Sequence, residues 1–139
     1  MYHKILIASD GSEHSRKAAE RAVFIASSSI GAELEIVYVV DEDEVRAEVL
    51  NNWSAADVKN IRENQLMDIE SLVKKANIDY QVKILHGDPG PVIVKYANEN
   101  QFDLVVIGSS GLNKFQEFVL GSVSQKVAKR SNSSVLIAK

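Results

Sequence analysis

The sequence of 139 residues predicts an α/β fold, in which a doubly wound, five-stranded parallel sheet carries helices on both faces. Two observations lead to this prediction. Short apolar runs rich in β-branched residues recur along the chain, as is typical of strands buried on both faces of a parallel sheet. Between these runs, apolar residues repeat at spacings of three and four, which is the period of an amphipathic helix. Such alternation indicates right-handed crossovers within one domain, residues 1–139.

The predicted strands are apolar runs bounded by polar residues or glycine. They cover residues 4–8, 34–40, 80–85, 104–107 and 135–138. All of them are expected to be buried on both faces, as short apolar, β-branched runs indicate.

Each of the predicted helices lies between two predicted strands. The first carries an apolar stripe that runs to Ile30, and we expect Gly31 to end it, because glycine readily adopts the conformation that closes a helix. The second opens at residues 54–57, which resemble a capping box, and its stripe continues to Ala76. The third begins at Pro89, since proline suits a first helical turn. The fourth is predicted over residues 119–130.

Composition excludes several classes of protein. With 45% apolar and 25% charged residues, the chain has the balance of a folded domain. It has no cysteine, which excludes thiolate metal sites and cysteine nucleophiles. A net charge of −3 without a basic cluster argues against nucleic acid as a partner. No apolar run is long enough for a membrane span or a signal peptide, so we expect a cytoplasmic protein without membrane contact.

The segment 41–52 is acidic and separates the second strand from the second helix. One interpretation is a solvated loop, and the other is a flap over a ligand with Trp53 near its base. The histidines His3, His14 and His86 show no metal-ligand spacing.

Two segments follow predicted strands at the edge where parallel sheets bind ligands. They are residues 9–12, which read Ser-Asp-Gly-Ser, and residues 108–111, which read Gly-Ser-Ser-Gly. Glycine loops and a helix N-terminus present N–H groups to anions, so Gly121 and Ser122 could face a phosphate near Ser124. Alternatively, these glycines only shape a turn and allow close packing. Neither of the common phosphate-loop motifs, G-x-x-x-x-G-K-[ST] and G-x-G-x-x-G, is present.

Gly108, Gly111 and, nine residues later, Gly121-Ser122 resemble the G-2x-G-9x-G-[ST] motif of the universal stress protein family. Residues 4–12 are similar to that family's first strand and its DGS turn, and residues 104–108 to its fourth strand. Residues 121–127 resemble its LGSVSEKV segment, and residues 135–137 its closing strand. The resemblance spans essentially the whole chain.

This resemblance implies strand order 3-2-1-4-5, the adenine nucleotide alpha hydrolase-like fold, and an ATP site between strands one and four. Gly108, Gly111, Gly121 and Ser122 would hold the ribose and phosphates, and Asp10 would lie beside them. Val39 and Val40 would border the adenine. The implied contact residues are Ala8, Ser9, Asp10, Val39, Val40, Gly108, Ser109, Gly111, Leu112, Gly121, Ser122, Val123 and Ser124. The cofactor would be ATP, alone or with Mg²⁺, and Asp10 is the candidate metal contact.

The resemblance also implies a homodimer that pairs its last strands, here from Val135 through Ala138. Independently, a terminal apolar strand is poorly defended against edge pairing. The resulting hypothesis is a dimeric ATP-binding regulatory module of the stress response, with an unknown protein partner. Phosphoryl transfer requires positioned charges that the motif lacks, which favours binding over fast turnover. Two alternatives stay open: a slow metal-dependent ATP hydrolase using Asp10, and a dimeric interaction protein that binds no nucleotide.

Overall fold

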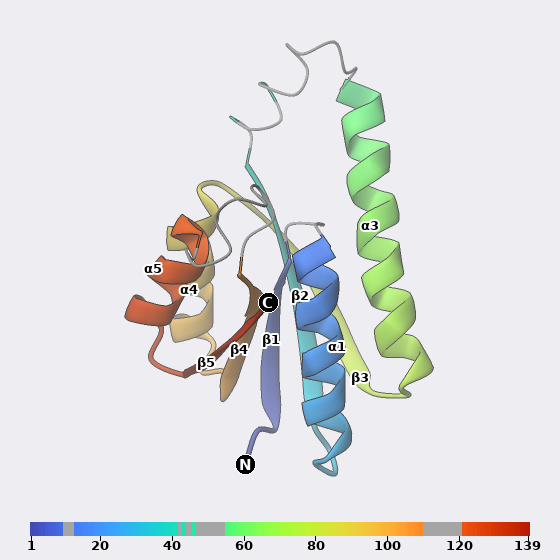
Figure 1. Ribbon diagram of the computed structural model, residues 1–139, viewed down its shortest axis with the longest axis vertical. Helices are drawn as coiled ribbons and strands as arrows, with labels where there is room; N and C mark the ends of the chain where they lie inside the picture. Colours follow the sequence, from blue (N-terminus) through green and yellow to red (C-terminus); the bar gives the residue numbers. More distant parts are fainter. Residues whose placement is uncertain (10–12, 42, 44–45, 47–54, 110–120) are drawn as a thin grey trace.

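The computed structural model describes residues 1–9, 13–41, 43, 46, 55–109 and 121–139, and it confirms the predicted fold class (Figure 1). The strands are β1 (Lys4–Ser9), β2 (Glu33–Val40), β3 (Asp79–His86), β4 (Leu104–Gly108) and β5 (Ser134–Ala138). They form one sheet in the order β3-β2-β1-β4-β5, and every neighbouring pair is parallel. This order is the one that the family resemblance implied.

Helices cover the two faces of this sheet in pairs (Figure 1). The helices are α1 (Glu13–Ser27), α3 (Ala55–Lys75), α4 (Pro89–Glu99) and α5 (Ser122–Arg130). The first two pack on one face and the last two on the other, as a doubly wound fold requires. In the part of the chain that the structure describes, no helix is long and apolar enough to cross a membrane.

The central strands supply most of the core on both faces. On β1, the side chains of Ile5 and Ile7 pack toward α1 and α3, whereas those of Leu6 and Ala8 pack toward α4 and α5. The helix α1 meets the sheet through a row of small residues: Ala18, Ala19, Ala22 and Ala26. Because alanine is short, this face lets the helix lie close against the sheet.

The end of α1 differs from the prediction. The helix ends at Ser27, and the side chain of Ile30 is fully exposed instead of continuing the apolar stripe. The hydroxyl groups of Ser27 and Ser28 donate to the carbonyls of Val23 and Phe24, at 2.8 and 3.3 Å. Serine side chains that bond to the preceding turn compete with helix continuation, which explains the early end. The chain then turns at Gly31, whose φ of +78° favours glycine.

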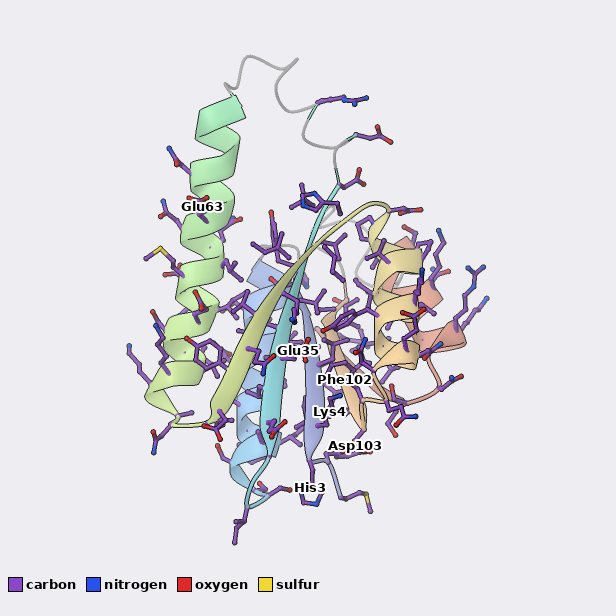
Figure 2. The ribbon with its side chains drawn as sticks, turned by 180° about the vertical axis from the view of Figure 1, so that it is seen from behind. His3, Lys4, Glu35, Glu63, Phe102 and Asp103 are labelled. Carbon is purple, nitrogen blue, oxygen red and sulfur yellow. The ribbon has the colours of Figure 1, made fainter. Side chains whose placement is uncertain are left out.

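The expected burial of every strand on both faces is wrong for β3. Its side chains alternate between half-buried and exposed along most of its length, and Ile84 is 55% exposed. The strand lies at the edge of the sheet, and Figure 2 shows it in front of β2, between α3 and α4. Residues 80–84 alternate between apolar and polar side chains, which is typical of a strand with one solvated face and agrees with this edge position.

The start of the last helix also differs. A helix was expected over residues 119–130, but α5 begins at Ser122, and Gly121 before it is extended, with φ −61° and ψ 158°. Residues 119 and 120 lie outside the described residues, as does most of the acidic segment 41–52 together with Trp53.

Candidate functional site

The order of the strands reverses direction between β1 and β4. From β1 the chain passes to α1 on one face, and from β4 it leads to α5 on the other face. Ala8 pairs with Ile107, so Ser9 and Gly108 lie at neighbouring strand ends. In open α/β sheets this divergence of connections creates the crevice where ligands bind. Both segments that the sequence singled out, residues 9–12 and 108–111, begin here.

The end of β4 is fastened to the beginning of α5. The carbonyl of Ser109 accepts hydrogen bonds from the Gly121 amide at 3.0 Å and from the Ser124 hydroxyl at 3.1 Å. The same hydroxyl lies 2.6 Å from the Gly108 carbonyl. Ser124 is only 2% exposed, and its single hydroxyl hydrogen is directed to these two carbonyls. Its described contacts therefore hold the junction together.

Ser109 contacts both β5 and α1. Its amide donates to the Ala138 carbonyl at the end of β5, over 2.8 Å. Its hydroxyl lies 3.2 Å from Nδ1 of His14, in the first turn of α1. Both main-chain groups of Ser109 are thus engaged within the fold, so the hydroxyl is the polar group that it can present to a ligand.

Gly108 lacks a side chain for a reason visible in the fold. A Cβ atom at this position would lie 2.7 Å from Cβ of His14 and 2.8 Å from the His14 carbonyl carbon and oxygen. Real Cβ atoms do not approach backbone atoms so closely, so any larger residue would push α1 away from β4. Close packing of α1 therefore requires glycine here, whether or not a ligand also approaches this position.

The N-terminus of α5 has the properties of an anion site. Its N-cap residue is Gly121, and no side-chain hydrogen bond caps the helix. The first turn contains no acidic residue, whereas Lys129 and Arg130 occupy the last turn. Ser122 is exposed, and Val123 packs against the α4–α5 core. The first amides of such a helix, together with its dipole, favour a negative charge.

The predicted adenine border lies at the end of β2. Val39 is buried in the core beneath α4, and Val40 is half-buried. The Val40 carbonyl accepts a hydrogen bond from the Gly87 amide at 3.1 Å, so one of its lone pairs is already used. Ala8 and Ser9 are also buried, at the end of β1.

Three predicted contacts, Asp10, Gly111 and Leu112, lie outside the described residues. Asp10 is also the candidate metal contact, so this prediction too lies outside the described residues. Within the residues that the structure does describe, there is no group of three or more side chains able to hold a metal ion.

His14 is the residue that sequence reasoning passed over. It was tested only for metal-ligand spacing, which it lacks. A usable signal was its place in the first turn of the helix that follows β1, because that turn begins at the carboxyl edge of the sheet.

The strand order and the connections together define a doubly wound α/β domain whose parallel sheet reverses its order between β1 and β4. The model of the universal stress protein family matches residues 1–139, and the chain belongs to this family. The universal stress protein YxiE of Bacillus subtilis is 32% identical over 149 residues, covering 100% of both chains.

Two solved structures extend the comparison. The protein MJ0577, the subject of a structure-based assignment of biochemical function, has a TM-score of 0.82 and 29% identity, covering 100% of this chain and 96% of that chain. A universal stress protein in complex with cAMP has a TM-score of 0.71 and 29% identity, with 99% and 97% covered.

Proposed function

We propose that this protein binds an adenine nucleotide, ATP alone or with Mg²⁺, between the carboxyl ends of β1 and β4. The observation that carries the proposal is the uncapped N-terminus of α5, held against Ser109 by Gly121 and Ser124. A helix start without a capping side chain offers N–H donors to a phosphate group. The cAMP complex of a relative that is 29% identical supports an adenine nucleotide as the ligand.

The proposed contacts follow the order of the crevice. The amides of Ser122, Val123 and Ser124 and the Ser122 hydroxyl receive the phosphates. Ser109, which is bonded to the start of α5, faces the phosphates. Gly108 and Ser9 lie toward the ribose, while Ala8 and the end of β2 at Val39 and Val40 border the adenine. Asp10, Gly111 and Leu112 belong to the proposal through the sequence motif alone.

Binding without fast turnover fits the described part of this site. Its side chains at the junction are serines and His14, none of which carries a permanent charge. Phosphoryl transfer needs charges placed around the transferring group. We therefore propose a regulatory module whose nucleotide occupancy is read by a protein partner in the stress response. In this proposal two copies pair through β5, the apolar edge strand.

Gly121→Asp tests the phosphate position. The backbone angles at Gly121, φ −61° and ψ 158°, are ones that any residue adopts, and aspartate is a good N-cap, so the free energy of unfolding is expected to stay equal or rise by a few tenths of a kcal/mol. ATP affinity is expected to fall at least about tenfold, because the carboxylate would occupy and repel the phosphate site. Calorimetric titration of ATP, with and without Mg²⁺, measures the affinity.

Gly121→Asn is the matched control, because it has the same shape and capping ability without the charge. Its loss of ATP affinity is expected to be smaller than that of the aspartate variant. Equal ATP affinity in the wild type and in both variants would place the ligand elsewhere. No binding of ATP, AMP or cAMP by the wild type would refute the proposed function.

A further inference from the structure

We propose that His14 is a positioning residue of the nucleotide site, and that its protonation turns the Ser109 hydroxyl from an acceptor into a donor toward the ligand. This inference rests on the proposed function. It concerns the regulation of the site by pH, and not the presence of the site.

The hydroxyl is the polar group of Ser109 that remains available to a ligand. Its amide bonds to Ala138, and its carbonyl accepts from Gly121 and Ser124. Its hydroxyl lies 3.2 Å from Nδ1 of His14. Packing of the His14 backbone on Gly108 fixes the base of the imidazole, so the ring is held beside Ser109.

The two protonation states of His14 demand opposite roles from Ser109. A serine hydroxyl has one hydrogen to donate and two lone pairs to accept with. When Nδ1 is unprotonated, it accepts that hydrogen, and the serine can offer only lone pairs to a ligand. When the ring is an imidazolium, Nδ1–H donates to the hydroxyl oxygen, and the serine hydrogen is released toward the ligand.

The charged groups near His14 come from several elements. On α1 its neighbours are Glu13, Arg16 and Lys17. β1 and β4 end in the uncharged residues Ser9, Gly108 and Ser109, and Asp10, which follows Ser9 in the sequence, lies outside the described residues. Lys139 follows β5, and Glu63 lies on α3, the helix beside α1 (Figure 2). Lysine, arginine and carboxyl groups ordinarily keep their charge between about pH 5.5 and 8, whereas histidine changes its own.

The consequence is a preference that depends on the ligand's charge. A phosphate oxygen accepts hydrogen bonds, so it gains a donor and a nearby positive charge when His14 is protonated. A neutral nucleoside gains little from the charge. The affinity for an anionic nucleotide is therefore expected to rise as pH falls, and the affinity for adenosine to change much less.

Titration of the wild type with cAMP between about pH 5.5 and 8 tests this inference, since the single charge of a cyclic phosphodiester does not titrate in that range. The dissociation constant is expected to be about five- to tenfold lower at the acidic end. His14→Asn keeps a polar group near the Nδ1 position without a titration, and Ser109→Ala removes the relay. Both variants are expected to give flat profiles, whereas the control His86→Gln keeps the wild-type slope. Adenosine serves as the uncharged probe.

Imidazole ¹⁵N spectra of the ligand-free protein give a second readout. The neutral ring of His14 is expected to carry its hydrogen on Nε2, with an Nδ1 resonance that shifts in Ser109→Ala. A hydrogen on Nδ1 of the neutral ring would overturn the inference. So would cAMP binding with the same affinity across the pH range, which would leave the proposed function intact. Failure of the wild type to bind cAMP, ATP or AMP at any pH would overturn the proposed function and this inference with it.

Discussion

Glu35 is an acidic side chain in the interior of the sheet, on β2. It points to the α4 face, where it accepts a hydrogen bond from the Tyr96 hydroxyl. Partial burial raises the pKa of Glu35, and the nearby charges of Lys4 and Lys83 offset this only in part. Figure 2 shows Glu35 and Lys4 on adjacent strands, with Phe102 beside Lys4, whose Nζ lies 4.7 Å from the ring centroid. The ionised form of Glu35 therefore costs the folded state some stability.

This cost sets a direction for Glu35→Gln. A pKa raised by folding contributes stability below the unfolded pKa, and that contribution is lost as pH rises through the folded pKa. We expect the variant to gain stability relative to the wild type between pH 4 and pH 7, because its amide still accepts from Tyr96 but never ionises. Denaturant unfolding of both proteins at the two pH values measures the difference. A difference that is constant with pH would contradict the assignment.

The helix α1 depends on its row of small residues. Ala18, Ala19 and Ala22 are fully buried against the sheet, so no space remains for a larger side chain. The same helix also positions the site, because its first turn packs on Gly108 and brings His14 to Ser109. Displacement of α1 is therefore expected to affect both stability and the crevice.

Ala22→Leu tests this packing. Overpacking of a close-packed core typically costs about 1 to 3 kcal/mol, and we expect a loss in that range. Arg21→Leu is the matched control: it places the same side chain on the same helix at an exposed position, and its effect is expected to stay within about 0.5 kcal/mol. Equal losses in the two variants, measured by denaturant unfolding, would show that α1 does not rely on its alanine face.

The sheet has two edge strands, β3 and β5, which differ in length and in the burial of their side chains. β3 has eight residues that alternate between half-buried and exposed along most of the strand. β5 has five, and its apolar residues Val135, Leu136 and Ile137 are all half-buried. Unpaired strand edges are templates for association, and an apolar one more so than a charged one. Pairing of two copies is proposed through β5 on this ground.

Leu136→Arg and Ile84→Arg place the same charge on the two edges. If copies pair through β5, the first change brings like charges together and is expected to weaken the dimer at least about tenfold. The second is expected to leave the dimer unchanged. Sedimentation equilibrium measures association, and circular dichroism checks that each variant folds. A dimer lost only in Ile84→Arg would assign pairing to β3, and a wild-type monomer would refute pairing.

The sequence by itself determined the element order and the fold class, because parallel strands and amphipathic helices each leave a local period in the chain. Family resemblance added the strand order and named the segments at the crevice. The sequence pattern also placed a helix near Gly121, although the boundary fell three residues too early, since an apolar run does not reveal where extended backbone ends.

Only the tertiary structure decided what the junction residues contact. Gly108 faces the backbone of His14, Ser109 meets the His14 ring, and the Ser124 hydroxyl bonds to the Gly108 carbonyl. Each of these contacts joins residues that are far apart in the chain. The exposure of Ile30 has the same origin, because burial depends on which elements end up next to each other. A local pattern fixes what an element is, and packing fixes what each of its side chains touches.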